Sequence, residues 1–181
     1  MTSRQRVIEA INHREGDYVP LDIGGCGQTG INASTLYALR RAFGLKEHPI
    51  EICEPMQLLG TIEPDLLTKM GVDVVPLWNR GNLFGLSGPK EKPWNMPDGT
   101  PALMPKDFEY DVEENGYTMV YPAGDRGASY SLHMTPGGTF FDNIYRSPPV
   151  DEDNLTPLED FRENYTLKTE EDGIHWEREI E

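Results

Sequence analysis

The stretch that decides the predicted fold is residues 17–30, which read D-Y-V-P-L-D-I-G-G-C-G-Q-T-G. An apolar run at 18–23 predicts a strand, and the glycine cluster after it has the spacing G-x-G-x-x-G, ending at Gly30. Such glycines let a backbone approach a pyrophosphate at a helix N-terminus. In a dinucleotide fingerprint the helix begins inside the motif, whereas the best capping residue here, Asn32, lies beyond the last glycine. The cluster therefore favours a glycine-rich turn between a strand and a helix over a nucleotide loop.

Helix and strand signals alternate through residues 1–81. A capping box of Thr2 and Gln5 starts the first helix, Asn32 caps the second, and Gly71 ends the third. The expected elements are helices at 2–13, 33–43 and 64–70, and strands at 18–23 and 72–77. The order helix, strand, helix, helix, strand predicts an α/β protein whose parallel sheet is covered by helices.

The pattern changes at residues 82–147, where proline and glycine are frequent and no helical period is present. Alternating apolar and polar residues flank Asn115-Gly116, which is a strong signal for a β-hairpin. A third alternating run at 130–134 predicts another strand. We interpret this region as an antiparallel, β-rich insertion into the α/β body.

Residues 148–181 form an acidic segment with renewed helix signals. Capping residues predict helices that start after Thr156 and after Thr169, and the sequence stops inside the second of these. We therefore expect a truncated chain. Residues 151–181 carry twelve acidic and three basic side chains, a balance of -9, which is typical of a solvated face or a loose end.

The overall charge of -15 argues against nucleic acid as a partner, because phosphate binding needs clustered Lys and Arg. No apolar run is long enough to span a bilayer, and the N-terminus lacks the apolar stretch of a signal peptide. With only two cysteines, Cys26 and Cys53, the chain lacks the cysteine content of a disulfide scaffold, so a reducing cytoplasm is the expected compartment. No Cys or His has metal-ligand spacing, so no metal site is predicted in this chain.

Four polar residues follow the two predicted strands and are our candidates for substrate binding. Asp22 and Gln28 follow the first strand, and Asn79 and Arg80 follow the second. In a barrel of parallel strands, polar side chains at the strand C-termini line the active site. An arginine there can bind a carboxylate through two parallel hydrogen bonds. A surface loop with a helix cap explains the same residues equally well.

Several motifs together resemble the uroporphyrinogen decarboxylase-like family. They are T-S-R-Q-R-V-I-E-A-I-N-H-R-E-G-D-Y-V-P-L-D-I-G-G at 2–25, L-L-T-K-M-G-V-D-V-V-P-L at 66–77, Y-P-A-G-D-R-G at 121–127 and M-T-P-G-G-T-F-F-D at 134–142. The last two resemble the branch that contains corrinoid-linked methyltransferases. The resemblance implies a (β/α)8 barrel of TIM type, of which this chain holds the N-terminal half, with the antiparallel hairpin region as an insertion.

The same resemblance implies a function. A methyltransferase of this branch moves a methyl group between a small methylated substrate, a corrinoid and a thiol or pterin acceptor. It implies a corrinoid protein as partner, and zinc bound by His and Cys of the second half, so no zinc ligand or other cofactor is assigned to this half. A homo-oligomer is a further expectation, because a half-barrel leaves sheet edges open.

Two departures bear on the choice within the family. The decarboxylase carries an R-Q-A-G-R type motif after its first strand, where this chain reads G-G-C-G-Q-T-G without arginine. It also carries an Asp after its second strand, where this chain has Asn79-Arg80. Decarboxylation of uroporphyrinogen or a related carboxylic acid is therefore the alternative function, and an inactive fragment or non-catalytic partner is the third.

Overall fold

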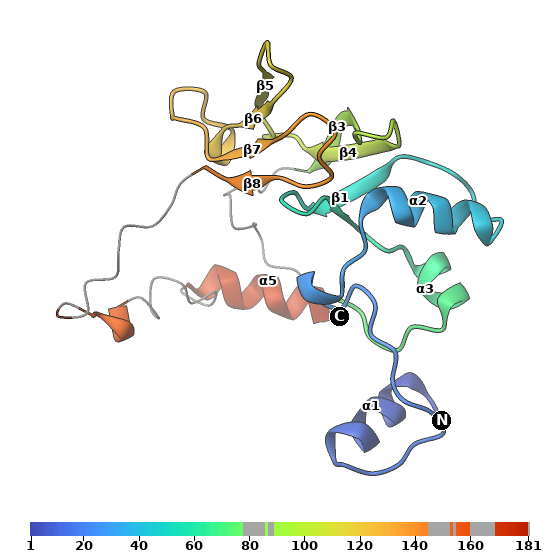
Figure 1. The fold of residues 1–181 in the computed structure, drawn as a ribbon. Coiled ribbons are helices and arrows are strands. Elements are labelled where there is room, and N and C mark those ends of the chain that lie inside the picture. The colour runs from blue at the N-terminus through green and yellow to red at the C-terminus, as the bar shows by residue number, and fades with distance from the viewer. Residues whose placement is uncertain (78–85, 87–88, 145–152, 154, 160–168, 181) are drawn as a thin grey trace.

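Two small sheets organise the chain in this computed structural model, and no closed barrel is found in the residues that it describes, 1–77, 86, 89–144, 153, 155–159 and 169–180 (Figure 1). The predicted (β/α)8 barrel fold is therefore wrong. The helices are α1 (Ser3–Ile11), α2 (Ala33–Ala42), α3 (Pro64–Met70) and α5 (Glu170–Ile180), with short 3-10 turns η1 (Gly27–Thr29) and η2 (Pro122–Gly124). The strands are β1 (Ile50–Glu54), β2 (Leu59–Gly60), β3 (Lys90–Asn95), β4 (Pro101–Pro105), β5 (Tyr110–Val112), β6 (Thr118–Val120), β7 (Leu132–Met134) and β8 (Asp142–Asn143).

The helix boundaries follow the capping signals of the sequence. Thr2 and Gln5 form the predicted capping box of α1, and the side chain of Asn32 accepts a hydrogen bond from the Ser34 amide at the start of α2. Gly71 ends α3 in the left-handed region with φ of 69°. Each of these groups satisfies backbone donors or acceptors that a helix end leaves unpaired. The three predicted N-terminal helices are thus confirmed.

The first sheet has the strand order β2-β1-β4-β3. β1 pairs in parallel with β4, with Ile50 opposite Ala102, and the two outer pairs are antiparallel. β1 alternates between buried and exposed positions, so that Ile50 and Ile52 point into the core. α2 packs against β1 and β2, and its buried Leu36 belongs to the same core as the strand side chains. The sheet thus joins chain segments that lie far apart in the sequence.

The second sheet, β5-β6-β7-β8, is antiparallel throughout. Its first hairpin turns at Asn115-Gly116, where Gly116 has φ of 84° and the Asn115 side chain accepts from the Tyr117 amide at 2.9 Å. The predicted hairpin and the strand predicted at 130–134 are both confirmed in position, the latter as β7. The sheet lies beside the first one in Figure 1.

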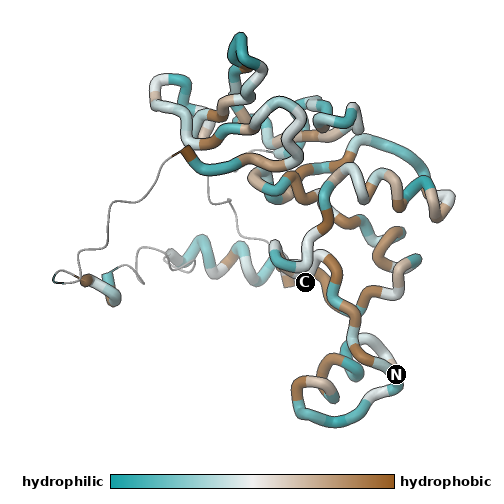
Figure 2. The backbone as a smooth tube through the Cα atoms, viewed as in Figure 1, coloured by the Kyte–Doolittle hydropathy of each residue, from teal (hydrophilic) through white to brown (hydrophobic). Residues whose placement is uncertain are grey.

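One hydrophobic core serves both sheets. Phe108 and Phe141 are fully buried, with ring centroids 6.1 Å apart, and Trp94 from β3 packs against both rings. In Figure 2 brown, apolar stretches run through the chain around α3, whereas α5 is mostly teal and polar. The backbone amide of Phe141 also donates to the carbonyl oxygen of Met56 at 2.6 Å, which ties the end of the second sheet to the turn between β1 and β2.

The two strands predicted at 18–23 and 72–77 do not form, so these predictions were wrong. Neither segment has regular secondary structure, and neither joins a sheet. Their apolar side chains are largely exposed, with Val19 at 85% and Val75 at 67%. A parallel strand needs neighbours on its edges and covers on its faces, and the described residues supply neither here. The parallel pairing found among the described residues is instead between β1 and β4.

The C-terminal helix signals agree with the structure where it describes them. Residues 157–159 are helical after Thr156, and α5 starts directly after Thr169. The Thr169 hydroxyl accepts from the Asp172 amide, and the Asp172 carboxylate accepts from the Thr169 amide. Within the described residues, no helix combines the length and the apolar character that crossing a membrane requires.

Candidate functional site

The two segments that were expected as strands lie side by side. The Asp73 amide donates to the carbonyl oxygen of Leu21 at 2.8 Å, and the Asp73 side chain accepts from the Leu21 amide at 3.0 Å. Asp73 therefore hydrogen-bonds both the backbone amide and the backbone carbonyl group of Leu21. This contact brings the neighbourhood of residues 22–30 next to the segment that follows α3.

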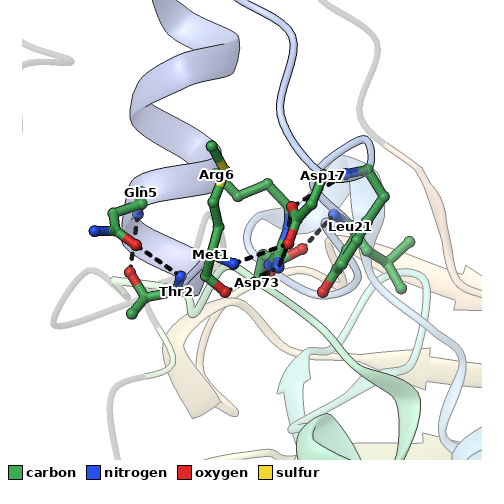
Figure 3. A network of polar contacts seen from close by, with 8 residues as sticks. Met1, Thr2, Gln5, Arg6, Asp17, Leu21 and Asp73 are labelled. Atoms are coloured by element: carbon green, nitrogen blue, oxygen red, sulfur yellow. Dashed lines mark hydrogen bonds and ion pairs between the residues drawn. The ribbon is translucent and has the colours of Figure 1, made fainter.

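A buried ion pair anchors this contact to the first helix (Figure 3). Arg6 of α1 donates through Nη1 to Asp73, whose side chain is only 1% exposed. The pKa of the Asp73 carboxyl lies below its usual value, chiefly because the Leu21 amide donates to it and further because Ser3 and Arg6 do. Asp73 is thus held as a carboxylate that joins α1, Leu21 and the end of α3.

The same arginine also holds the chain that returns from α1. Arg6 donates through Nε to Asp17 Oδ1 at 2.7 Å and through Nη2 to Asp17 Oδ2 at 2.9 Å. The bond from Arg6 holds the pKa of the Asp17 carboxyl well below its usual range. The guanidinium lies 3.5 Å from the ring centre of Tyr18, within cation–π distance. Arg6 therefore holds α1 together with the chain that returns from it. We call this helix and return, residues 1–18, the N-terminal hairpin.

Asp22 shapes the glycine-rich loop that follows. Its Oδ1 accepts from the Gly25 amide at 2.9 Å and from the Thr29 hydroxyl at 3.1 Å. The Gly24 amide donates to the carbonyl oxygen of Thr29 at 2.8 Å, which closes the loop. Such aspartate turns are common where a chain reverses between elements. Residues 22–30, which we call the Asp22 loop, are therefore ordered by their own contacts.

Cys26 lies inside the Asp22 loop, next to η1. Its Sγ lies 3.5 Å from the Thr29 hydroxyl oxygen, and its amide donates to the same oxygen at 3.2 Å. The pKa of the Cys26 thiol is lowered, first by the Thr29 hydroxyl and then by the backbone amides of Thr29 and Gln28. Cys53 in β1 differs, since burial raises the pKa of its thiol to about 11. We therefore expect Cys26 to be the more reactive thiol.

Packing accounts for two of the three motif glycines. A side chain at Gly25 would meet the Asp22 carboxylate, and one at Gly30 would meet the Leu59 methyl group, each at 2.5 Å. Gly27 faces open space. The helix α2 begins only at Ala33, after the motif. The glycines of the G-x-G-x-x-G motif thus belong to a tight turn packed on β2. This agrees with the prediction, made from the position of the Asn32 cap, that the motif is a turn between elements.

The structure describes two of the four candidate binding residues, Asp22 and Gln28. Asp22 and Gln28 both lie on the Asp22 loop and are exposed, so they can meet a ligand from solvent. Asp22 also has the structural role of holding the loop. Asn79 and Arg80 lie outside the described residues. The contact between Leu21 and Asp73 brings together the segment that leads to Asp22 and Gln28 and the segment that leads to Asn79 and Arg80.

Sequence reasoning missed the importance of Arg6 and Asp73. The signal was present in both cases, since Asp73 interrupts the apolar run V-D-V-V-P-L and Arg6 lies on the helix beside apolar Val7 and Ile8. A charge inside an apolar run needs a partner of opposite charge, because burying an unpaired charge is costly. Pairing the two residues required knowing that their segments meet.

The described residues contain no group of three or more His, Cys, Asp or Glu side chains that suits a metal ion. The family resemblance implies zinc ligands in the second half of the complete enzyme, outside these residues. A small cavity beside Arg40 and His48 measures about 10 Å³, which is far too small for a corrinoid. We assign no ligand of either group to these residues.

Comparison with known proteins leaves the family open. No protein-family model matches the chain, and neither a curated protein nor a solved structure matches it.

Proposed function

We propose that this chain takes part in corrinoid-linked methyl transfer from a small methylated substrate. The observation that carries the proposal is the contact between Leu21 and Asp73, which brings together segments 2–25 and 66–77, two of the four whose motifs resemble the uroporphyrinogen decarboxylase-like family. The loop that follows the first segment exposes two polar side chains, Asp22 and Gln28, at this junction. The cytoplasm, where free thiols such as Cys26 and Cys53 persist, is the proposed compartment.

The proposed role of the described residues is binding and orientation of the substrate. Asp22 offers an exposed carboxylate whose position is fixed by Gly25 and Thr29, so it can accept hydrogen bonds without reorganising the loop. Gln28 offers both a donor and an acceptor from η1. Asn79 and Arg80 remain the proposed partners from the second segment. No bond-breaking role is assigned to any of the four.

Methyl transfer can be measured directly. We would incubate the protein with cob(I)alamin and a panel of methylated alcohols, amines and thiols, and follow the appearance of methylcobalamin by absorbance. The reverse direction uses methylcobalamin and a thiol acceptor. In that direction the added methylcobalamin would supply the methyl group, and the methylated thiol is the product to be measured. Methyl transfer in either direction supports the proposal.

The alternatives give different results in parallel assays. Release of carbon dioxide from uroporphyrinogen without methyl transfer would establish the decarboxylase, and the absence of both reactions would favour a non-catalytic partner. Asp22→Asn keeps an oxygen that can accept from Gly25 and Thr29, and should raise the KM for the methylated substrate. Glu114→Gln, which removes the same charge from the exposed turn between β5 and β6, is the matched control and should leave the KM unchanged.

A further inference from the structure

The turn between β5 and β6 holds the one Asn-Gly pair of the sequence, Asn115-Gly116, and has no part in the proposed site. Both residues are exposed, so water reaches them directly. Gly116 has φ of 84°, and a Cβ there would lie 3.0 Å from Pro136 Cγ. The left-handed backbone and the close neighbour together select glycine at this position. The same selection leaves the Gly116 nitrogen without a side chain that would shield it from the Asn115 amide.

Two hydrogen bonds hold the Asn115 side chain next to this nitrogen. Its Oδ1 accepts from the Tyr117 amide at 2.9 Å, and its Nδ2 donates to Glu113 Oε2 at 3.1 Å. The bond to Tyr117 closes a ring of side-chain and backbone atoms that includes the Gly116 nitrogen, so Asn115 Cγ is kept close to it. The Tyr117 N–H also points at the oxygen that becomes negative when Cγ is attacked, and a donor in this place stabilises that charge.

One bond works against such an attack. The Gly116 amide donates to the carbonyl oxygen of Glu113 at 2.8 Å, which holds the proton that the nitrogen has to lose. The attack therefore waits until the turn opens locally and a base from solvent takes this proton. Exposed turns open far more often than core strands do, so the reaction does not need global unfolding.

We propose that Asn115 is a site of self-modification, at which the chain converts its own asparagine into aspartate and isoaspartate. The Gly116 nitrogen loses its proton to solvent base and forms a bond to Asn115 Cγ. The Cγ–Nδ2 bond breaks, and the amide nitrogen takes a proton from water and leaves as ammonia. Water then opens the cyclic imide and returns a proton to the Gly116 nitrogen. Opening at Cγ gives aspartate, and opening at the backbone carbonyl carbon gives isoaspartate.

A second turn of the chain supplies a matched comparison. At Asp98-Gly99, the Gly99 amide donates to the carbonyl oxygen of Met96 at 2.8 Å, and Gly99 has φ of 85°. The Asp98 Oδ1 accepts from the Thr100 amide at 3.0 Å, and this bond lowers the pKa of the Asp98 carboxyl. The two turns are thus alike, but a carboxylate resists attack by a nucleophile and has no ammonia to release. We therefore expect Asn115 to react and Asp98 to persist.

The product changes the charge of the turn. Glu113 and Glu114 already carry negative charges beside residue 115, and the new carboxylate adds another. The donor from Asn115 to Glu113 is lost and is replaced by repulsion between like charges. Isoaspartate also adds a carbon atom to the backbone of the turn, which displaces the bond from the Glu113 amide to the carbonyl oxygen of Tyr117. The modification therefore loosens the end of β5 and β6 at the turn.

The test is incubation of the folded protein in mildly alkaline buffer, followed by peptide mass spectrometry with electron-transfer fragmentation, which separates aspartate from isoaspartate. We expect both products at residue 115, release of ammonia, and a rate that rises with pH. Asn143 is the control in the same chain, because it is also exposed but is followed by the branched Ile144. Asn143 and Asp98 should stay unchanged while Asn115 is lost. Loss of Asn115 no faster than that of Asn143, or aspartate without isoaspartate, would overturn the proposal.

Asn115→Asp is the second arm of the test. It keeps an oxygen that accepts from Tyr117 but has no amide, so it should release no ammonia from this turn. Isoaspartate that forms as fast in this variant as in the unmodified chain would show that the amide is not the reacting group. Amide hydrogen exchange at Glu113 in the aged protein reports the loosened turn and should rise relative to amides of β7. Unchanged exchange there would contradict the mechanical consequence.

Discussion

Gly30 and Leu59 are in such close contact that a single methyl group at residue 30 would lie 2.5 Å from Leu59 Cδ1. Leu59 belongs to β2, at the edge of the first sheet, and its own side chain is almost fully buried. Residue 30, the last glycine of the motif, therefore has no side chain that would clash with Leu59 where the chain passes over it. The same contact fixes the approach of the Asp22 loop to β2.

We expect Gly30→Ala to destabilise the protein by about 1–3 kcal/mol, because the new methyl group must displace a core side chain. Gly27→Ala is the matched control, since a side chain there meets nothing within 4 Å. Its effect should stay within about 0.5 kcal/mol. Urea unfolding followed by circular dichroism measures both. Equal effects of the two substitutions would contradict the packing account of the motif.

Phe108 anchors the shared core of the two sheets. Phe108→Ala should lower the free energy of unfolding by about 3–5 kcal/mol, because the residue is fully buried and its loss leaves a cavity. Phe140→Ala removes the same side chain from a position that is 57% exposed, and should cost much less. Chemical unfolding of the two variants compares them. A small effect at Phe108 would show that the sheets do not share one core.

Acid should release the hairpin formed by residues 1–18. The pKa values of Asp17 and Asp73 are lowered in the folded protein, so the stability they contribute is present above the unfolded aspartate pKa of about 4 and is lost as the pH falls below it. Amide hydrogen exchange in α1 should rise at low pH before exchange in β6 does.

Arg6→Gln tests the origin of that acid sensitivity. It removes the charge that stabilises both carboxylates, so it should destabilise α1 at neutral pH and flatten the pH dependence of its exchange. Arg14→Gln is the control, because Arg14 pairs with Glu9 on the same hairpin but its side chain is 60% exposed. Exposed pairs of this kind contribute little to stability. A steep acid transition that persists without Arg6 would contradict the role assigned to it.

The two thiols should react at different rates. The pKa of the Cys53 thiol, about 11 against an ordinary value of 9.0, lowers its thiolate fraction about 100-fold at neutral pH. The pKa of Cys26 is lowered by Thr29. Iodoacetamide should therefore alkylate Cys26 first, as peptide mass spectrometry can measure. Thr29→Val should slow the alkylation of Cys26 and leave Cys53 unchanged, whereas equal rates in the unmodified chain would contradict the assignment.

Local signals predicted the local structure well. The capping box at Thr2, the cap at Asn32, the helix end at Gly71 and the turn at Asn115-Gly116 are all present. Each depends on residues within a few positions of one another, so a single sequence contains the information. The exposed positions of Asp22 and Gln28 after the first of the two segments also agree with a place at a loop.

Predictions that depended on distant partners were less successful. The runs at 18–23 and 72–77 have the composition of buried parallel strands, but neighbouring strands decide whether such a run joins a sheet. The strand Ile50–Glu54 was missed, because charged residues interrupt it and its parallel partner, Pro101–Pro105, begins and ends with proline. Arg6 and Asp73, 67 positions apart, meet only in the folded chain.

The parallel pairing of β1 with β4 has a consequence for synthesis on the ribosome. When α3 has emerged, β1 has only the two residues of β2 as a strand partner, and the edge that receives Ala102 and Leu103 is still open. The first sheet cannot close until β4 has been translated. Pairing of segments so far apart in sequence slows folding and leaves intermediates that are prone to aggregate. The nascent chain therefore carries an unprotected strand edge through about fifty codons of translation, which is where chaperone contact is expected.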